Sequence, residues 1–160
     1  MNRLNKVMNT LARLPAGWQP AVRSLIIGKI IPFAGTAGCR VEVLTNHECR
    51  VVLKNRRKVG NHIGTVHAAA MALVAESATG FVAAMNVPDS RVLVIRSMEL
   101  TYLKRTKGDL TATATLSNDD LKRLTTEEKG DIAVPVVLRD SEGTESVTAT
   151  MVWAWTPKRK

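Results

Sequence analysis

The chain has 160 residues, which is the size of one ordinary domain and too short for two. Its content of 45% hydrophobic and 23% charged residues is typical of a globular protein and excludes a disordered, collagen-like or coiled-coil chain. Aromatic residues make up only 4%, so the core must be built from Ala, Val, Leu and Ile. The net charge of +9 favours anionic partners.

This positive charge is concentrated at the N-terminal end. Residues 1–41 contain six Lys or Arg and no Asp or Glu, whereas the rest of the chain is nearly balanced. Such a segment could be a transit peptide or a helix on a membrane surface. No small-residue cleavage site follows a compact apolar stretch, and Lys29 interrupts the stretch 26–31. We therefore interpret 1–35 as amphipathic helices packed on a single domain at 36–157, with contact to a membrane surface as an alternative.

The first elements are helical, and two strands follow them. Apolar residues recur at helical spacing over 4–14, and a second helix is predicted from Pro20 to Pro32. The period then changes to that of strands at 41–43 and 51–53, joined around 45–47. A basic run at 54–58 and a loop at 59–64 come next.

The remaining pattern is one long helix and then strands. The helix is predicted over 66–85, closed by Asn86 and Pro88. Four strands are predicted at 91–104, 109–117, 131–139 and 144–156, with hairpin turns at 107–109 and 141–143 and a capped helical turn at 118–124. This order predicts an α+β domain with an antiparallel sheet and one central helix.

The helix at 66–85 is apolar on every side, so it either crosses a membrane or is wrapped by protein. Its weakly hydrophobic, Ala-rich composition and a glutamate at its middle favour wrapping by the sheet. That glutamate, Glu76, is the one ionisable side chain between His67 and Asp89. Burial would raise the pKa of its carboxyl group, which suits a general base. The alternatives are a structural pairing with an arginine such as Arg96, or an exposed position on the helix.

The two cysteines and three histidines carry no metal signature. Cys39 and Cys49 are interpreted as buried thiols of a reducing, cytoplasmic environment. The histidines are scattered without acidic or cysteine residues at ligand spacing, so we expect neither a metal nor a cofactor. His67 and Glu76 are nine helical residues apart, so they face opposite sides about 13 Å apart along the axis. A site that uses both must be assembled between two subunits.

The run from Asn61 to Glu76 resembles the central-helix motif of the hotdog-fold acyl-CoA thioesterases, in the phenylacetate-pathway and thioesterase-superfamily group. That motif has an Asn, a Gly, then His-Gly-Gly, and an acidic residue nine positions after the His. Here His67 lies six residues after Asn61 and nine before Glu76, while Ala68 and Ala69 replace the two glycines. The resemblance covers about 38–156. It implies a hotdog fold, a curled sheet around the helix, and homodimers that often pair into tetramers.

The resemblance also implies roles for individual residues. Glu76 corresponds to the catalytic acid, Asn61 to the residue that orients the thioester or water, and His67 to the His that opens the helix. The Ala68 amide corresponds to the one that polarises the thioester carbonyl. Further substrate-binding candidates are the loop residues His62 and Gly64 and two basic clusters that could bind the phosphates of CoA: Arg56, Arg57 and Lys58, and Lys104, Arg105 and Lys107.

Three functions remain open at this point. The leading one is hydrolysis of an acyl-CoA or acyl-carrier thioester at a site shared by two subunits. A hotdog dehydratase of hydroxyacyl thioesters is a second, because it pairs a His with a Glu fourteen residues later, as His62 and Glu76 are spaced. The third is a non-catalytic acyl-CoA-binding, lipid-binding or regulatory protein. Nucleic acid is disfavoured as a partner because no helix-turn-helix pattern is present.

Overall fold

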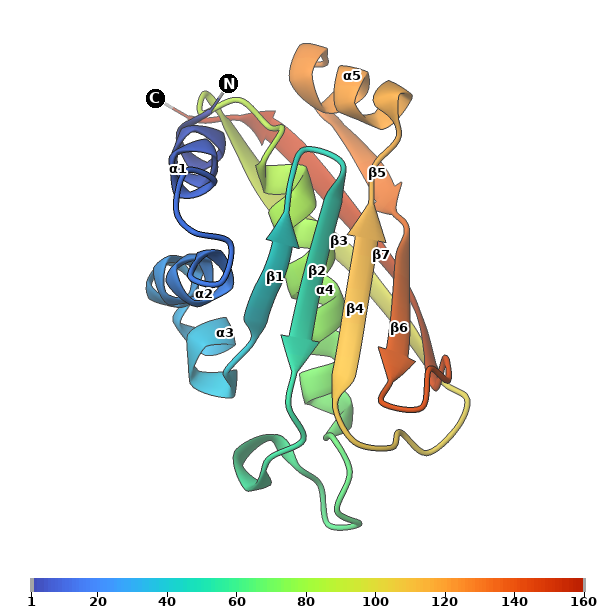
Figure 1. Ribbon diagram of the computed structural model, residues 1–160. Helices are drawn as coiled ribbons and strands as arrows, with labels where there is room; N and C mark the ends of the chain where they lie inside the picture. Colours follow the sequence, from blue (N-terminus) through green and yellow to red (C-terminus); the bar gives the residue numbers. More distant parts are fainter. Residues whose placement is uncertain (1, 160) are drawn as a thin grey trace.

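The computed structural model describes residues 2–159 and shows an antiparallel sheet curled around one long helix (Figure 1). Six strands follow one another across the sheet in the order β1-β2-β4-β6-β7-β3, and β5 pairs with β7. The long helix, α4 (Ala68–Ala84), lies against one face of this sheet. The strands are β1 (Arg40–Leu44), β2 (Glu48–Leu53), β3 (Arg91–Tyr102), β4 (Leu110–Thr115), β5 (Gly130–Val134), β6 (Val136–Asp140) and β7 (Val147–Pro157).

The long helix is wrapped by the sheet, as its apolar composition predicts. Its middle and C-terminal turns are buried almost throughout, and they pack on β2, β4 and β7. Small side chains on α4 allow this close approach, and Trp153 of β7 donates a 2.9 Å hydrogen bond from its indole to Thr79. No helix within residues 2–159 has the length and hydropathy needed to cross a membrane.

Three helices precede the sheet, where the sequence predicts two. They are α1 (Arg3–Leu11), α2 (Gln19–Ile30) and α3 (Pro32–Ala37), and they lie beside β1 (Figure 1). The sequence predicts that the second helix ends before Pro32, and in the structure Pro32 also occupies the first position of α3. Proline is favoured there because its missing N–H needs no partner in the first turn. On α2, the buried Arg23 donates hydrogen bonds to the carbonyls of Val41 and Glu42 and joins the helix to β1.

Two predictions about the later strands are wrong. The single strand expected at 131–139 is divided by Pro135 into β5 and β6: β5 pairs with β7, whereas β6 pairs along its length with β4 and touches β7 at one residue pair. Proline has no N–H for a sheet hydrogen bond, so the ladder is interrupted at this residue. The expected hairpin at 107–109 is a connection between strands that are not neighbours, since β3 pairs with β7 whereas β4 pairs with β2 and β6.

The remaining local predictions are confirmed. The turn at 141–143 joins the adjacent strands β6 and β7, and Gly143 there has a φ of 77°. The helical turn expected at 118–124 is the helix α5 (Asn118–Thr126), capped reciprocally by Ser117 and Asp120. Cys39 and Cys49 are both free and buried thiols.

Candidate functional site

The loop that leads into α4 is held by the side chain of Asn61. Its Oδ1 accepts hydrogen bonds from the amides of Ile63 and Thr65, at 3.1 and 3.0 Å. Its Nδ2 donates to the Thr65 hydroxyl at 2.8 Å. These contacts lie within the loop. In the single chain, Asn61 therefore fixes the backbone conformation of the loop that precedes α4. His62 and Gly64 are exposed at the tip of this loop, where Gly64 has a φ of 78°.

The first turn of α4 presents a free backbone donor. His67 is the N-cap, and its Nδ1 accepts a hydrogen bond from the amide of Ala69 at 3.0 Å. The amide of Ala68 donates no hydrogen bond within residues 2–159, and this residue is exposed. The first N–H groups of a helix lack intrahelical acceptors and lie at the positive end of its dipole. The Ala68 N–H can therefore donate to a carbonyl oxygen that gains negative charge.

Ala68 also lies next to the edge of the sheet. The hydroxyl of Tyr102, at the end of β3, donates a hydrogen bond to the Ala68 carbonyl at 3.1 Å. Strand β3 is the last strand of the sheet, and within residues 2–159 it pairs with β7 alone. The start of α4 and the open edge of the sheet thus form one continuous region of the molecule.

Glu76 lies two turns further along α4, on the same face as Ala69 and Leu73. It makes no ion pair within the described chain. Arg96, the structural partner considered from the sequence, pairs instead with Asp131. Burial raises the pKa of the Glu76 carboxyl group above its usual value, and the Ser77 hydroxyl opposes this rise. The carboxylate is therefore a stronger base than an exposed glutamate.

Cys39 is the other titratable group close to Glu76. Burial raises the pKa of its thiol to about 11, and the negative charge of Glu76 adds to the rise, while Lys58 opposes it. A thiol with this pKa remains protonated at neutral pH and is a poor nucleophile. Glu76 is therefore the side chain of this pair that can act as a base.

A pocket of about 260 Å³ lies beside the first two turns of α4. We call it the α3 pocket, because α3 forms one wall and α4 the opposite one. Its lining is mostly apolar and consists of Phe33, Thr36, Ala37, Lys58, Val59, Gly60, His67, Ala69, Ala70 and Leu73. Lys58 closes one side by donating a 2.7 Å hydrogen bond to the Thr36 carbonyl. Glu76 follows Leu73 by one turn and does not itself line the pocket.

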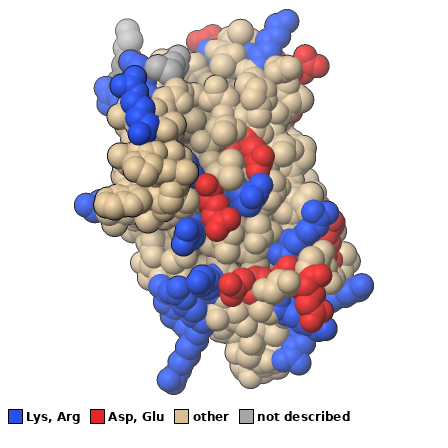
Figure 2. Space-filling model, viewed as in Figure 1, with Lys and Arg blue, Asp and Glu red and all other residues tan. Residues whose placement is uncertain are grey.

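The two basic clusters border the same loop. Arg56, Arg57 and Lys58 lie in and before the short helix η1 (Arg57–Val59), and all three are exposed. From the β3–β4 connection, Arg105 donates a hydrogen bond to the Ile63 carbonyl. Lys104 is exposed in the same connection, whereas Lys107 is paired with Glu142 at 2.9 Å. Figure 2 shows blue side chains gathered at this lower end of the molecule.

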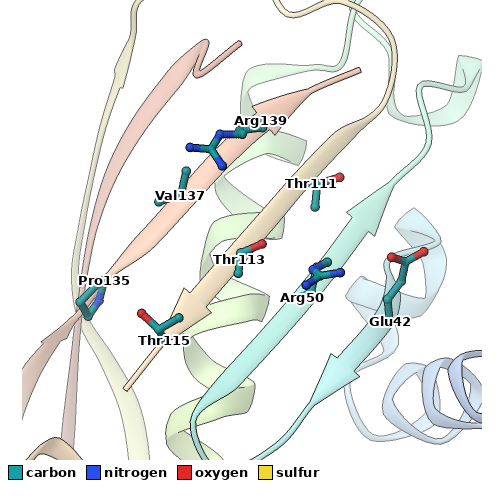
Figure 3. A pocket seen from close by; sticks show the side chains of 8 residues that line it. All are labelled: Glu42, Arg50, Thr111, Thr113, Thr115, Pro135, Val137 and Arg139. Carbon is teal, nitrogen blue, oxygen red and sulfur yellow. The ribbon is translucent and has the colours of Figure 1, made fainter. Parts of the chain in front are cut away.

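A larger pocket of about 610 Å³ lies on the sheet face opposite α4 (Figure 3). It contains none of the residues that the sequence analysis selected. Two of its lining residues are arginines that form ion pairs: Arg50 pairs with Glu48, and Arg139 pairs with Glu145. A row of threonines on β4 forms its floor, and the alternation of Thr and Ala in that strand is the sequence signal for it. The lining is Glu42, Arg50, Thr111, Thr113, Thr115, Pro135, Val137 and Arg139.

The residues of α3 that face the site were not predicted from the sequence. Helix α3 is only six residues long, and it contributes Phe33, Thr36 and Ala37 to the pocket. Its signal in the sequence is the proline at its start, Pro32, and the glycine after its end, Gly38. In the structure Gly38 has a φ of 83°. Among residues 2–159, no three His, Cys, Asp or Glu side chains are grouped as metal ligands.

The curled antiparallel sheet around one long helix is a hotdog fold, and solved structures share it. A Pseudomonas aeruginosa protein of unknown function, described as "Probable Thioesterase", has a TM-score of 0.77 at 23% identity, covering 91% of this chain and 97% of its own. A thioesterase family protein from Silicibacter pomeroyi has a TM-score of 0.68 at 15% identity, covering 86% and 98%. A Haemophilus influenzae thioesterase has a TM-score of 0.65 at 12% identity, covering 78% and 82%.

Residues 20–155 match the family model described as "Domain of unknown function (DUF4442)". The chain belongs to this family. A comparison with curated proteins found no match. The matched region begins at the first turn of α2, so it includes α3 and the whole sheet as far as Trp155.

Proposed function

We propose that the protein hydrolyses an acyl-CoA or acyl-carrier thioester at the start of α4. The observation that carries this proposal is the pair formed by a free helix N-terminal amide, at Ala68, and an unpaired carboxylate with a raised pKa, Glu76, on one helix. A donor for the developing oxyanion and a base for water are the two groups that acyl transfer to water requires. The thioesterase descriptions of the structural relatives support the same reaction class.

In the proposed reaction, the thioester carbonyl oxygen accepts a hydrogen bond from the Ala68 amide. Water loses a proton to the Glu76 carboxylate while its oxygen attacks the carbonyl carbon. The carbon–sulfur bond then breaks, and the proton passes from Glu76 to the departing sulfur. The products are a carboxylic acid and a free thiol. Arg56, Arg57 and Lys104 are the exposed bases that would bind the phosphates of CoA at the same end of the molecule.

The two catalytic groups are best supplied by different subunits. Within one chain, Ala68 and Glu76 are eight helical residues apart, or about 12 Å along the axis, which is too far for one carbonyl group to contact both. Ala68 is joined by Tyr102 to β3, whose outer edge has no partner strand within residues 2–159. Apolar side chains are exposed along this strand and its end, at Val92, Val94, Met98, Tyr102 and Leu103. A long apolar edge strand of this kind favours pairing with a second copy.

Two variants that each remove one group test the reaction and the shared site together. Glu76→Gln removes the base. Ala68→Pro removes only an amide hydrogen, because proline suits the first position of a helix and His67 has the extended conformation that precedes proline. Each variant alone should release no thiol from a panel of acyl-CoAs. Dimers formed from an equal mixture of the two should recover about a quarter of the wild-type rate, since half of the dimers are mixed and each of these has one intact site.

The control is Ala68→Gly, which keeps the amide and should stay active. Recovery of activity in the mixture supports a site shared between subunits, and absence of recovery would contradict the shared site. If the wild-type protein binds acyl-CoA without releasing thiol, the protein is a binding module and the hydrolase proposal is wrong.

A further inference from the structure

The N-terminal helices carry a second exposed apolar surface, separate from the β3 edge. It is formed by Trp18, Leu25, Ile30, Ile31 and Phe33, and we call it the N-terminal apolar surface. Trp18, Leu25 and Phe33 have 69%, 62% and 67% of their surface exposed, which makes them the three most exposed large hydrophobic residues in the described chain. Trp18 and Leu25 are seven residues apart and therefore lie on one side of α2.

The charged side chains of α1 and α2 are all basic, and Asp89, from the loop after α4, reaches this region at the Arg3 amide. Arg3, Lys6, Arg13 and Lys29 are exposed, and none of them makes an ion pair within residues 2–159. No acidic residue occurs before Glu42. Lys29 follows Leu25 by one turn, so a base stands directly beside the apolar side chains. In Figure 2, the part of the surface that covers α1 and α2 is blue and tan.

Other residues attach α2 to β1 and to α3. Helix α2 is attached to β1 through the buried residues Arg23 and Ile27, on the side opposite Trp18 and Leu25, and Ile30 is the last residue of this helix. Helices α2 and α3 approach each other through glycines: a Cβ on Gly35 would lie 2.8 Å from the Gly28 carbonyl oxygen. The large apolar side chains thus remain outside the packed regions.

We propose that the N-terminal apolar surface binds an anionic lipid membrane. Exposed Trp, Phe and Leu side chains beside Lys and Arg are the composition of helices that lie in a membrane interface, where the apolar side chains enter the acyl boundary and the bases contact lipid phosphates. A protein partner with a matching apolar face would not by itself account for the absence of acids over residues 1–41. The α3 pocket opens beside this surface, because Phe33 belongs to both.

The intrinsic fluorescence of Trp18 tests this proposal directly. The chain has three tryptophans, and Trp153 and Trp155 are buried, with 6% and 1% exposure, so a shift in emission on binding reports on Trp18. Equimolar phosphatidylglycerol and phosphatidylcholine vesicles should shift the emission to the blue and sediment with the protein. Pure phosphatidylcholine vesicles should do so much more weakly, and added salt should weaken the binding.

Matched variants separate the apolar and the charged contributions. The double variant Leu25→Ser with Phe33→Ser should reduce partitioning into the anionic vesicles by tenfold or more. Arg13→Glu with Lys29→Glu should cause a similar loss. Val137→Ser removes an exposed apolar side chain from the outer face of the sheet and should leave partitioning unchanged. Thermal unfolding of each variant establishes that it is folded.

Three results would overturn the proposal. The first is the absence of co-sedimentation with the anionic vesicles. The second is equal binding of the wild type and the Leu25→Ser, Phe33→Ser variant. The third is a blue shift that follows protein concentration without vesicles, which would assign the surface to contact with a second copy of the chain. These results are independent of thioester hydrolysis, because each of them measures vesicle binding or self-association and none measures turnover.

Discussion

Gly80 of α4 lies directly against the indole ring of Trp153 on β7: a Cβ built on Gly80 would lie 2.5 Å from the ring carbon Cζ2. The neighbouring residue Thr79 accepts the hydrogen bond from the same indole. Both the ring carbons and the N–H of the indole therefore contact one turn of the helix. This contact sets how closely the central helix approaches the sheet.

The first prediction is that Gly80→Ala destabilises the protein. Alanine would gain up to about 1 kcal/mol from helix propensity. The added methyl group must displace Trp153, and overpacking of this kind costs about 1–3 kcal/mol or more. We expect a net loss in the free energy of unfolding, measured by urea denaturation. Gly17→Ala is the control, because a Cβ there meets no atom within 4 Å. If the Gly80→Ala variant and the wild type have equal free energies of unfolding, Trp153 can move away from α4 without loss of stability, and the prediction is wrong.

The second prediction concerns the pH dependence of stability at Glu76. Burial raises the pKa of this carboxyl group in the folded chain above the usual value of 4.5. The carboxylate therefore opposes folding, so stability should decrease as the pH rises from about 4.5 through the folded-state pKa. Glu76→Gln should abolish this decrease and should equal or exceed the wild type in stability at pH 7. Urea midpoints over a series of pH values measure the difference.

The control for this experiment is Glu128→Gln, at an exposed position. If Glu76→Gln instead loses stability at neutral pH, the carboxylate has a stabilising partner, and its proposed role as a base is contradicted. A buried pair broken in this way would cost about 3 kcal/mol or more.

The third prediction is that the outer edge of β3 forms a dimer interface. Val94 and Met98 have 46% and 51% of their surface exposed on this strand. Val94→Asp places a charge in the proposed interface, so sedimentation at micromolar concentration should show monomers and thioester hydrolysis should fall with the dimer. Val137→Asp, at a site that is 39% exposed on β6, should change neither. A wild-type protein that sediments as a monomer would contradict both the interface and the shared site.

The fourth prediction is that asparagines attach α1 to the domain. The amide of Asn5 donates to the Asn46 side chain at 2.5 Å and to the Met85 carbonyl, near the end of α4, at 3.2 Å. Asn5→Ala leaves the buried Met85 carbonyl without this donor, which should cost about 1–3 kcal/mol of stability. Limited proteolysis should then cleave the first eighteen residues faster than in the wild type.

Thr10→Ala serves as the comparison, because the Thr10 hydroxyl is exposed and donates a hydrogen bond to the Lys6 carbonyl of its own helix. If proteolysis removes α1 rapidly from the wild-type protein without changing its melting temperature, the attachment through Asn5 contributes nothing to the fold.

Local sequence patterns determined much of this molecule. The apolar run around Glu76 is sufficient to predict a buried central helix, because a helix without a polar face must be covered and a single carboxylate within it must be desolvated. The changes in period identify most strands, and the polar residues Ser117 to Asp120 predict the start of α5. Each of these inferences depends on residues within about one or two helical turns of one another.

The tertiary structure decided everything that depends on distant residues meeting. In the folded chain Arg96 forms an ion pair with Asp131, and Glu76 has no ion pair within the described residues. The spacing of these residues in the sequence does not show which acid Arg96 pairs with. The tertiary structure also divided the strand at Pro135 between two partners, and it placed α3 opposite α4 to form a pocket. Strand order and side-chain partners follow from the packing of the whole chain, in which many pairings have similar local preferences and only their combined burial selects one.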